Sequence, residues 1–455
     1  MTVADIRAQT VNGGREPRVR SVSFLTFILR LLEPGGVTVP GEDPGEAQVE
    51  LDKGIDGRAH LPGTSLAGAL REMVRGQRGG DVADDWFGRI AGGPEADARA
   101  SRVWVLGSRR LDDGGSQVLS STRIDRTRGA AADNTLRTEE VLPAGSSFEV
   151  FLRWDDAAPG EVADLAGLVA AWRPLIGRGT SRGRGRCAVE AVRHGTLRLD
   201  DPDDLLRWLT LSGPELARAV AVRPVSAPGG EVPAELLFRV PVTIKGPWHI
   251  GNGDRPQPGP REPAPLLRVG GRPAVPGTAV KGLLRSRAEF ILRSVGLEPP
   301  PCEKAGCGAC WTCQVFGHGG GKDAGSAAAG RRAAVRFADA VITSPVETTR
   351  THIAIDRFTG GVLDGALYTM EVLEGGSFAI EAELLSAGVG EARRAEIAAV
   401  LRLVLEDLND GIIGMGGGTA RGYGSVDVRF GEAAGDLPSP GQARRTLAAM
   451  VRGGA

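Results

Sequence analysis

Four cysteines lie within twelve residues of the chain, close enough together to surround one metal ion. They follow the spacing C-x4-C-x2-C-x2-C, and a nearby histidine could replace one of them; the residues are Cys302, Cys307, Cys310, Cys313 and His318. Four thiolates can bind Zn²⁺ tetrahedrally, and a short loop with little core of its own gains order from the metal. The alternatives are free thiols or disulfides, and disulfides are disfavoured in the cytoplasm. We predict a structural zinc site, which leaves no open position for chemistry.

Two glycine-rich loops carry arginines at matching positions and could bind a phosphate chain. Glycine lets a backbone approach a phosphate closely, and backbone N–H groups together with arginine can hold it. The alternative is a tight helix-to-strand loop with solvated arginines. Because matching loops recur in halves of the chain that have otherwise diverged, we favour the binding role. The residues are Gly179, Thr180, Arg182, Gly183 and Arg184 in the first loop, and Gly418, Thr419, Arg421, Gly422 and Tyr423 in the second.

A third repeated feature is the tripeptide Ile-Asp-Arg, which falls in a predicted hairpin in each half. Its charged residues are Asp125 and Arg126 in the first half, and Asp356 and Arg357 in the second. They could form local salt bridges that shape a turn. The other interpretation is a protruding hairpin that inserts between nucleotides of a duplex.

Other catalytic arrangements have no support in the sequence. No two of the five histidines are placed as an evident acid–base pair; they are His60, His194, His249, His318 and His352. The Gly-x-Gly patterns follow predicted helices and lead into strands, which is the wrong context for a P-loop. No Ser-His-Asp or Cys-His arrangement can be proposed. A ribonuclease driven by histidine is therefore unsupported.

The sequence segments predicted to position these motifs occur twice in the chain. The stretch 61–71 recurs at 275–285, and each copy is a Pro-Gly turn followed by a predicted helix with Thr64 or Thr278 as its N-cap. The Ile-Asp-Arg hairpins and the glycine loops recur in the same order. Their offsets are 214, 231 and 239 residues, and they grow because the second copy carries insertions, one of which holds the four clustered cysteines. We infer a tandem duplication.

The predicted elements follow the same order in both copies: strand, helix, strands, helix, strand. This β-α-β-β-α-β order is that of the ferredoxin-like split unit, whose sheet leaves one face free, and such a face commonly meets RNA. We predict an α+β fold with two such domains. The boundaries are a mobile leader at 1–20, a first domain at 21–200, a connector at 201–235, a second domain at 236–430 with an insertion at about 300–320, and a polar tail at 431–455.

The composition is that of a globular protein and limits its partners. The 455 residues suffice for two or three domains, and a net charge of −1 argues against a protein that is basic all over and coats duplex DNA. The sequence still allows a local basic surface that binds nucleic acid, because four arginines fall within 178–186. No apolar run approaches the length of a membrane span, and the polar N-terminus lacks the apolar centre of a signal peptide. We expect a cytoplasmic protein that does not bind a membrane, and Cys187 in the core.

The repeated motifs together resemble the RAMP superfamily, and more narrowly the two-unit backbone subunits of type III CRISPR–Cas effector complexes. The resemblance covers about residues 20–430, in two copies. The segment Cys-Trp-Thr-Cys-Gln-Val-Phe-Gly at 310–317 is similar to the cysteine-containing segment that precedes Phe-Gly in that family. The first copy has Asp-Trp-Phe-Gly at 85–88 instead, so we expect its metal site to be lost.

The resemblance implies an RRM-like core in each unit that holds part of a CRISPR guide RNA. The glycine loop would approach the guide backbone, and the hairpin would displace one nucleotide of the guide–target duplex. The partners would be the guide, complementary target RNA and other type III effector subunits. Lys281 and Arg285, on the second repeated helix, complete the predicted RNA-binding set.

In the cleaving members of the family, an aspartate in the loop after the first strand supports metal-dependent cutting of target RNA. Carried onto this chain, the first copy offers Asp52, with Glu46 six residues before it and Asp43 nearby. The second copy has no aspartate at the corresponding place, and Asp254 lies far upstream. A carboxylate can hold Mg²⁺ or Mn²⁺ and orient water, but carboxylates in loops are commonly only solvated. The sequence therefore leaves the endoribonuclease activity open.

Three other readings stay open at this point. A guide-precursor-processing endoribonuclease of the same superfamily would share the fold and the glycine loop, and would cut without a metal. A non-catalytic RNA-binding scaffold would need only the loops and hairpins. A zinc-stabilised structural protein unrelated to RNA is compatible with the near-neutral charge.

Overall fold

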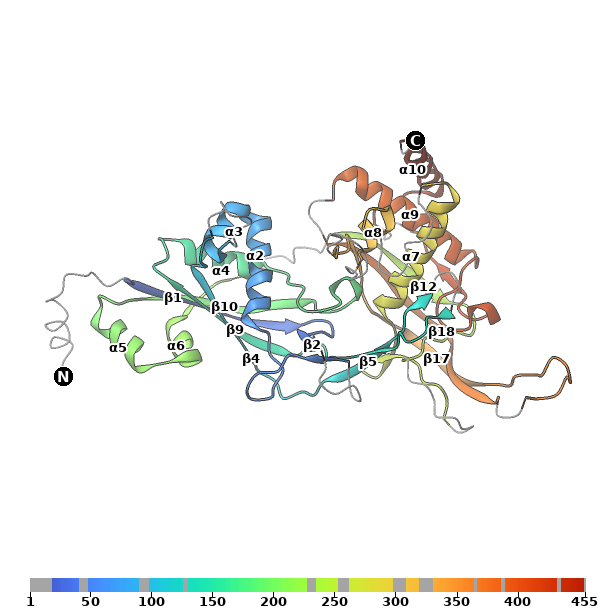
Figure 1. Cartoon of the computed structure of the whole chain (residues 1–455), viewed down its shortest axis with the longest axis horizontal. Coiled ribbons are helices and arrows are strands. Elements are labelled where there is room, and N and C mark those ends of the chain that lie inside the picture. Colours follow the sequence, from blue (N-terminus) through green and yellow to red (C-terminus); the bar gives the residue numbers. More distant parts are fainter. Residues whose placement is uncertain are drawn as a thin grey trace.

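Each copy of the duplication builds its own α+β unit around an antiparallel sheet (Figure 1). The computed structural model describes residues 19–40, 48–89, 98–125, 130–226, 235–252, 262–297, 308–318, 330–363, 366–385, 389–431 and 435–453. Residues 1–18 of the predicted leader lie outside this set.

The first unit contains a five-stranded sheet with the order β11-β10-β1-β9-β4, in which all neighbours are antiparallel. β1 is mostly apolar and is buried along most of its length, as expected for a strand covered on both faces. Cys187 begins β10 and is 1% exposed, so its predicted place in the core is confirmed. The strands are β1 (Ser21–Leu31), β4 (Val103–Arg110), β9 (Ser147–Asp155), β10 (Cys187–Arg198) and β11 (Arg223–Pro224).

Three helices cover one face of this sheet, and the connector covers the other (Figure 1). On the first face lie α2 (Gly63–Arg78), α3 (Gly80–Phe87) and α4 (Glu161–Ala171). On the second face, Leu216 and Val220 pack against Phe24 and Phe151. The expectation of a free sheet face is therefore wrong for the first unit, because its strands present apolar residues on that side and the connector helices bury them. These helices are α5 (Pro202–Thr210) and α6 (Gly213–Val220).

The second unit has the strand order β15-β18-β12-β19, with β17 also paired to β18. β12 alternates between buried and exposed residues, the pattern of a strand covered on one face. The strands are β12 (Leu236–Ile244), β15 (Val335–Phe337), β17 (Thr343–His352), β18 (Tyr368–Leu384) and β19 (Val426–Val428).

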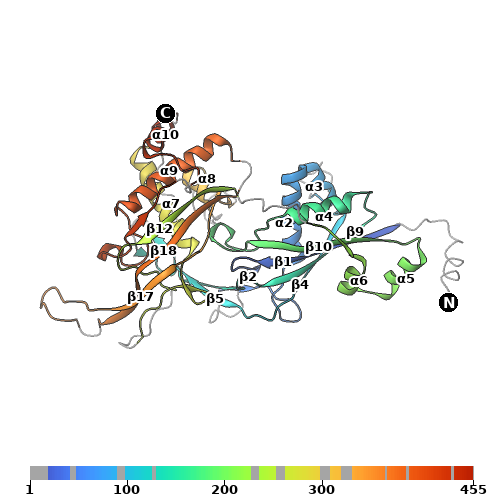
Figure 2. The same cartoon turned by 180° about the vertical axis from the view of Figure 1, so that it is seen from behind.

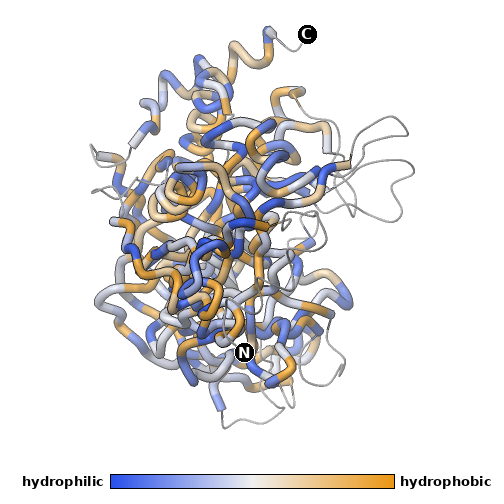
Figure 3. The backbone as a smooth tube through the Cα atoms, turned by 90° about the vertical axis from the view of Figure 1, so that its left-hand side faces the viewer, coloured by the Kyte–Doolittle hydropathy of each residue, from blue (hydrophilic) through white to orange (hydrophobic). Residues whose placement is uncertain are grey.

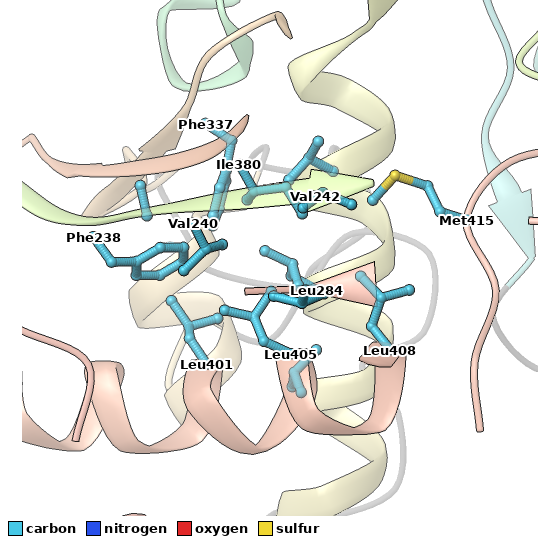
Figure 4. Packing of buried hydrophobic residues seen from close by; sticks show 14 of the residues in the cluster. Phe238, Val240, Val242, Leu284, Phe337, Ile380, Leu401, Leu405, Leu408 and Met415 are labelled. Atoms are coloured by element: carbon cyan, nitrogen blue, oxygen red, sulfur yellow. The ribbon is translucent and has the colours of Figure 1, made fainter. Parts of the chain in front are cut away.

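The core of the second unit lies between this sheet and two long helices (Figure 4). Val240 and Val242 of β12 face Leu284 of α7 and Leu401 and Leu405 of α9. The polar tail predicted at the C-terminus carries α10, whose apolar residues pack against the same core. The helices are α7 (Gly277–Ser294), α8 (Trp311–Phe316), α9 (Glu391–Asn409) and α10 (Pro440–Gly453).

Smaller strands extend both units. A four-stranded sheet has the order β2-β3-β8-β5, and its strands are β2 (Thr38–Pro40), β3 (Val49–Leu51), β5 (Gln117–Ser121) and β8 (Arg137–Val141). The remaining strands are β6 (Ile124–Asp125), β7 (Ala130–Ala131), β13 (Arg268–Val269), β14 (Arg272–Val275) and β16 (Ala340–Val341). Hydrophobic and hydrophilic residues are interleaved along the backbone (Figure 3), and none of the described helices is long and apolar enough to span a membrane.

The N-caps of the repeated helices lie two residues earlier than predicted, at Pro62 and Pro276. α2 starts at Gly63 and α7 at Gly277, each after a proline, so Thr64 and Thr278 lie inside the first turn and do not cap it. The glycine is required by packing: a Cβ on Gly63 would lie 2.6 Å from the carbonyl oxygen of Val105, and a Cβ on Gly277 would lie 2.3 Å from that of Phe337. The N-cap prediction was wrong: the residue at the N-cap is a proline in both copies, and the glycine after it is needed for close packing against a neighbouring strand.

Candidate nucleic-acid interface

The two glycine loops have the same backbone geometry. Each encloses a short 3-10 turn, η1 (Thr180–Arg182) or η2 (Thr419–Arg421), between two glycines with φ between 73° and 84°. These left-handed conformations favour glycine strongly. In each loop the arginine N–H donates to the carbonyl of the first glycine at 2.8 Å. The repeated sequence therefore encodes the same local structure twice.

The first loop is seated against the second unit. Lys281 Nζ donates to Ser181 Oγ at 2.8 Å, and a Cβ on Gly277 would lie 3.0 Å from the carbonyl oxygen of Arg182. Burial, together with the charges of Arg182 and Arg285, lowers the pKa of Lys281 to about 7. Lys281 therefore makes its hydrogen bond to protein within the chain, at the junction between the two units.

A network of buried charges lies beside this contact. The Arg336 guanidinium, which is 0% exposed, donates to the Thr180 carbonyl oxygen at 2.9 Å, to Glu383 at 3.1 Å and to Glu33. Arg186 binds Glu383 and lies 3.5 Å from Glu33. Each carboxylate thus meets two guanidinium groups, which offsets the cost of removing these charges from water. Since Glu33 and Arg186 belong to the first unit and Arg336 and Glu383 to the second, the network couples the two units.

The second loop is exposed, and aromatic residues attach it to the adjacent hairpin. Tyr423 OH lies 2.9 Å from His352 Nε2, and the rings of His352 and Tyr368 are stacked with centroids 5.1 Å apart. Arg421 donates to the hydroxyl of Tyr368. Both tyrosines of the chain therefore lie at this site. In the first unit the corresponding attachment is an ion pair, in which Arg184 Nη1 lies 2.8 Å from a Glu139 carboxylate oxygen.

The hairpin of β17 and β18 projects away from the rest of the second unit (Figures 1 and 2). Asp356 closes its distal turn by accepting N–H groups of Phe358 at 2.8 Å and Thr359 at 2.9 Å, and these bonds lower the Asp356 pKa. The aspartate thus shapes the turn through the backbone, while Arg357 is exposed. Phe358 is 92% exposed, and Ile355 and Val362 beside it are also largely exposed. Sequence analysis missed these apolar side chains, although Phe358 directly follows the repeated motif. In the first hairpin the structure describes Asp125 but not Arg126.

A family model for the RAMP superfamily matches residues 15–188 and 242–427, one match for each unit. The chain belongs to the RAMP superfamily. Solved structures similar to this RAMP protein include cryo-EM structures of type III-B Cmr-beta, one in the apo state and one bound to cognate target RNA. For each, the sequence identity is 11%, the TM-score is 0.31, and the match covers 37% of this chain and 96% of the other. A comparison with curated proteins found no match.

Of the four predicted catalytic carboxylates of this RAMP protein, the structure describes one. Asp43, Glu46 and Asp254 lie outside the described residues. Asp52 follows β3, is half-buried, and has a carboxylate oxygen 3.7 Å from His60 Nδ1. His60, which the sequence analysis did not place with any acid, also donates its backbone N–H to the Asp52 carbonyl at 3.0 Å.

The cysteine cluster of the RAMP protein is described in part. Cys310 caps α8, its Sγ accepting the N–H of Cys313 at 3.4 Å, and Arg285 Nη2 lies 3.5 Å from Cys313 Sγ. A Cβ on Gly308 would lie 2.8 Å from His318 Nε2, so the imidazole reaches the loop that leads to Cys310. Cys302 and Cys307 lie outside the described residues, and among the described ones no three His, Cys, Asp or Glu side chains form a group that could hold a metal.

Proposed function

We propose that this RAMP protein is a cytoplasmic backbone subunit of a type III CRISPR effector complex, in which it binds guide RNA. The observation that carries the proposal is the second glycine loop, which is exposed, is flanked by two left-handed glycines and carries Arg421. Backbone N–H groups and a guanidinium in such a loop suit a phosphate chain. Each unit is proposed to be ferredoxin-like. The first unit supports this with the spatial strand order β10-β1-β9-β4 and with helices that follow β1 and β9 along the chain.

The second hairpin is proposed to insert into the duplex formed by guide and target RNA. Exposed apolar side chains at its tip, above all Phe358, can enter between bases, as apolar wedges do in other nucleic-acid complexes. Target RNA and neighbouring effector subunits are therefore the proposed partners, together with the guide.

Guide binding is tested by purifying the tagged protein from its native host and sequencing the RNA that accompanies it. Short RNAs of uniform length that share part of a common repeat are expected. For binding in solution, Arg421→Ala is expected to reduce the slope of log affinity against log salt by about 0.7, the value for one phosphate contact on a single strand. Arg198→Ala, which removes an exposed arginine paired with Asp200 on another surface, is the charge-matched control. An unchanged slope in Arg421→Ala would remove this loop from the interface.

We also propose that the first unit cleaves target RNA, because Asp52 and His60 lie together directly ahead of α2. Mg²⁺ or Mn²⁺ held by acidic residues there would neutralise phosphate charge and activate water. Alanine at Asp43, Glu46, Asp52 and Asp254 is expected to leave guide binding intact and abolish cutting by the assembled complex. Cutting that survives would mean a non-catalytic scaffold, and metal-independent cutting of a guide precursor would favour the processing endoribonuclease.

A structural Zn²⁺ is proposed at the cysteine insertion. The N–H of Cys313 donates to the Cys310 sulfur at 3.4 Å, which holds the Cys-x2-Cys turn in shape, and thiolates at this spacing are common zinc ligands. Elemental analysis is expected to find one zinc per chain, and Cys310→Ser with Cys313→Ser is expected to remove it.

A further inference from the structure

The first glycine loop brings positive charge to the junction between the two units without an equal amount of negative charge. Burial lowers the pKa of Arg182, and repulsion from three neighbouring arginines lowers it further; these are Arg184, Arg178 and Arg137. Glu139 attracts Arg182, but its carboxylate is bound by Arg184 Nη1 at 2.8 Å. Among the described residues, Arg182 forms no ion pair of its own. Arg182 is therefore a half-buried cation without a matched acid.

The second unit places another cation at the same contact. Lys281 on α7 donates from Nζ to Ser181 Oγ at 2.8 Å, and Ser181 is the neighbour of Arg182 in the loop. The pKa of Lys281 is lowered to about 7, chiefly by burial and then by the charges of Arg182 and Arg285. Within the described part of the chain, Lys281 also forms no ion pair. Two cations from opposite units therefore lie together, and each disfavours the charge of the other.

The other acids of the junction are engaged elsewhere. Glu33 and Glu383 bind the buried guanidinium of Arg336. Asp339 Oδ1 accepts the Gly277 N–H at 2.6 Å at the start of α7, and burial raises the pKa of this aspartate to about 6. These contacts leave the charges of the loop arginine and of the lysine uncompensated.

The two repeated helices differ at the position of this lysine. The first repeated helix has Ala67 where the second has Lys281. The helices otherwise start alike, each with a proline followed by a glycine packed under a strand carbonyl. An alanine at 281 would avoid the repulsion from Arg182. A lysine that opposes an arginine in this half-buried contact costs stability by itself, and an anion between the two would offset that cost.

We propose that the junction binds a phosphate-type oxyanion between Arg182 and Lys281, and that this anion links the two units. Guanidinium and ammonium groups are the side chains that bind such anions, and both residues are only half-buried. Because each unit supplies one cation, the anion meets both only when the loop is seated. Anion binding and seating of the loop therefore stabilise each other. Two sources have this chemistry, a phosphodiester of bound RNA and a free phosphate, and only the first rests on the proposed function.

Sulfate is the probe, because it has the shape of phosphate and a constant charge near neutral pH. The thermal midpoint of the full chain, free of RNA, is measured in sodium sulfate and in sodium chloride of equal ionic strength. A rise specific to sulfate is expected. Lys281→Met and Arg182→Gln are each expected to weaken sulfate binding by about tenfold or more, the effect of losing one charge-assisted hydrogen bond. Arg198→Ala, on another surface, is the charge-matched control and is expected to keep the rise.

The dependence of the sulfate effect on pH is a readout that a purely structural lysine would not produce. The rise is expected to shrink between pH 7 and pH 9, because Lys281 must be protonated to bind the anion. The guanidinium groups that face it, those of Arg182 and Arg285, keep their charge in this range, and Asp339 at the start of the helix has a pKa of about 6. Lys281→Arg, whose charge persists at pH 9, is expected to keep the rise.

Short single-stranded RNA distinguishes the two sources when it is added to Arg421→Ala, in which the open loop has lost its arginine. A midpoint rise that disappears when Lys281→Met is added would identify the anion as an RNA phosphodiester. A sulfate effect without an RNA effect would identify a free phosphate-type anion.

Equal sulfate effects in the unmodified chain and in Lys281→Met would overturn the proposal, because the cation of the second unit would then take no part in binding. If Lys281→Met does not fold, equal sulfate effects at pH 7 and pH 9 in the unmodified chain overturn it instead. Because the sulfate measurements contain no RNA, a failure of guide binding in the test of Arg421→Ala would leave them unchanged.

Discussion

The two glycine loops of this chain share a sequence pattern and a backbone geometry, yet they have different surroundings. The first packs under the second unit, where Lys281 and Arg336 bind it. The second is open; Tyr368 and His352 of the adjacent hairpin contact its side chains, and its backbone bonds to Pro247 and His249 of the same unit. A motif that recurs inside one chain can therefore serve in one copy to join units and remain available for a ligand in the other.

The different surroundings of the two loops also decide which arginine substitution can test RNA binding. Removing Arg182 would change a loop that is part of the junction, so a loss of RNA binding could follow from a loosened junction. Removing Arg421 changes an exposed loop whose local contacts are few. The second loop is thus the cleaner site for RNA-binding experiments, and the first loop is the site for stability experiments.

The largest effect is expected at the buried charge network. Arg336→Ala would leave the buried Glu383 and the half-buried Glu33 with one guanidinium between them, and removing one partner of a buried ion pair costs about 3–5 kcal/mol. Chemical denaturation should show this loss in the free energy of unfolding. Arg421→Ala on the open loop is the control and should leave stability nearly unchanged. Equal losses in both variants would mean that the loops do not differ as described.

A matched pair of glycine substitutions tests the comparison next. Gly183 and Gly422 occupy the same place in their loops, with φ of 81° and 84°, so alanine at either costs roughly 1–2 kcal/mol in backbone strain. At Gly183 the new Cβ would also lie 2.5 Å from Asp339 Oδ1, whereas at Gly422 it would meet nothing within 4 Å. Thermal unfolding should therefore show a larger loss for Gly183→Ala. Equal losses would indicate that the first loop can shift without cost.

Several features of this fold follow from the sequence because they are local. The loops were predicted from glycines whose φ values only glycine adopts easily, and Cys187 was placed in the core from its apolar strand. The junction could not be predicted, because Arg336 and Glu33 are 303 residues apart in the sequence. No local sequence pattern around either residue indicates that the two form an ion pair. The need for glycine at position 63 could not be predicted for the same reason, since it arises from a carbonyl oxygen of β4. Contacts between the two units therefore cannot be predicted from local sequence patterns.

The seated loop should also give the chain a distinctive dependence on pH. The pKa of Lys281 is lowered from 10.5 to about 7, chiefly by burial, so between these values the unfolded chain binds a proton that the folded chain does not. The free energy of unfolding should therefore rise with pH across this window through Lys281. Denaturation of the unmodified chain and of Lys281→Met at pH 7 and pH 9 measures the difference. An identical pH dependence in both would show that Lys281 stays charged at the junction.

The smallest expected effect concerns the attachment of the open loop. Tyr423→Phe removes one hydroxyl, whose partner is His352 Nε2 at 2.9 Å, and a neutral hydrogen bond contributes about 0.5–1.5 kcal/mol. The matched change in the seated loop is Arg184→Ala, which removes an ion pair with the buried carboxylate of Glu139, while Arg178 lies farther from it, at 3.9 Å. We expect the arginine change to lower the unfolding midpoint more than the tyrosine change. The reverse order would mean that the hairpin depends on its aromatic contact, and that the open loop is held more firmly than the seated one.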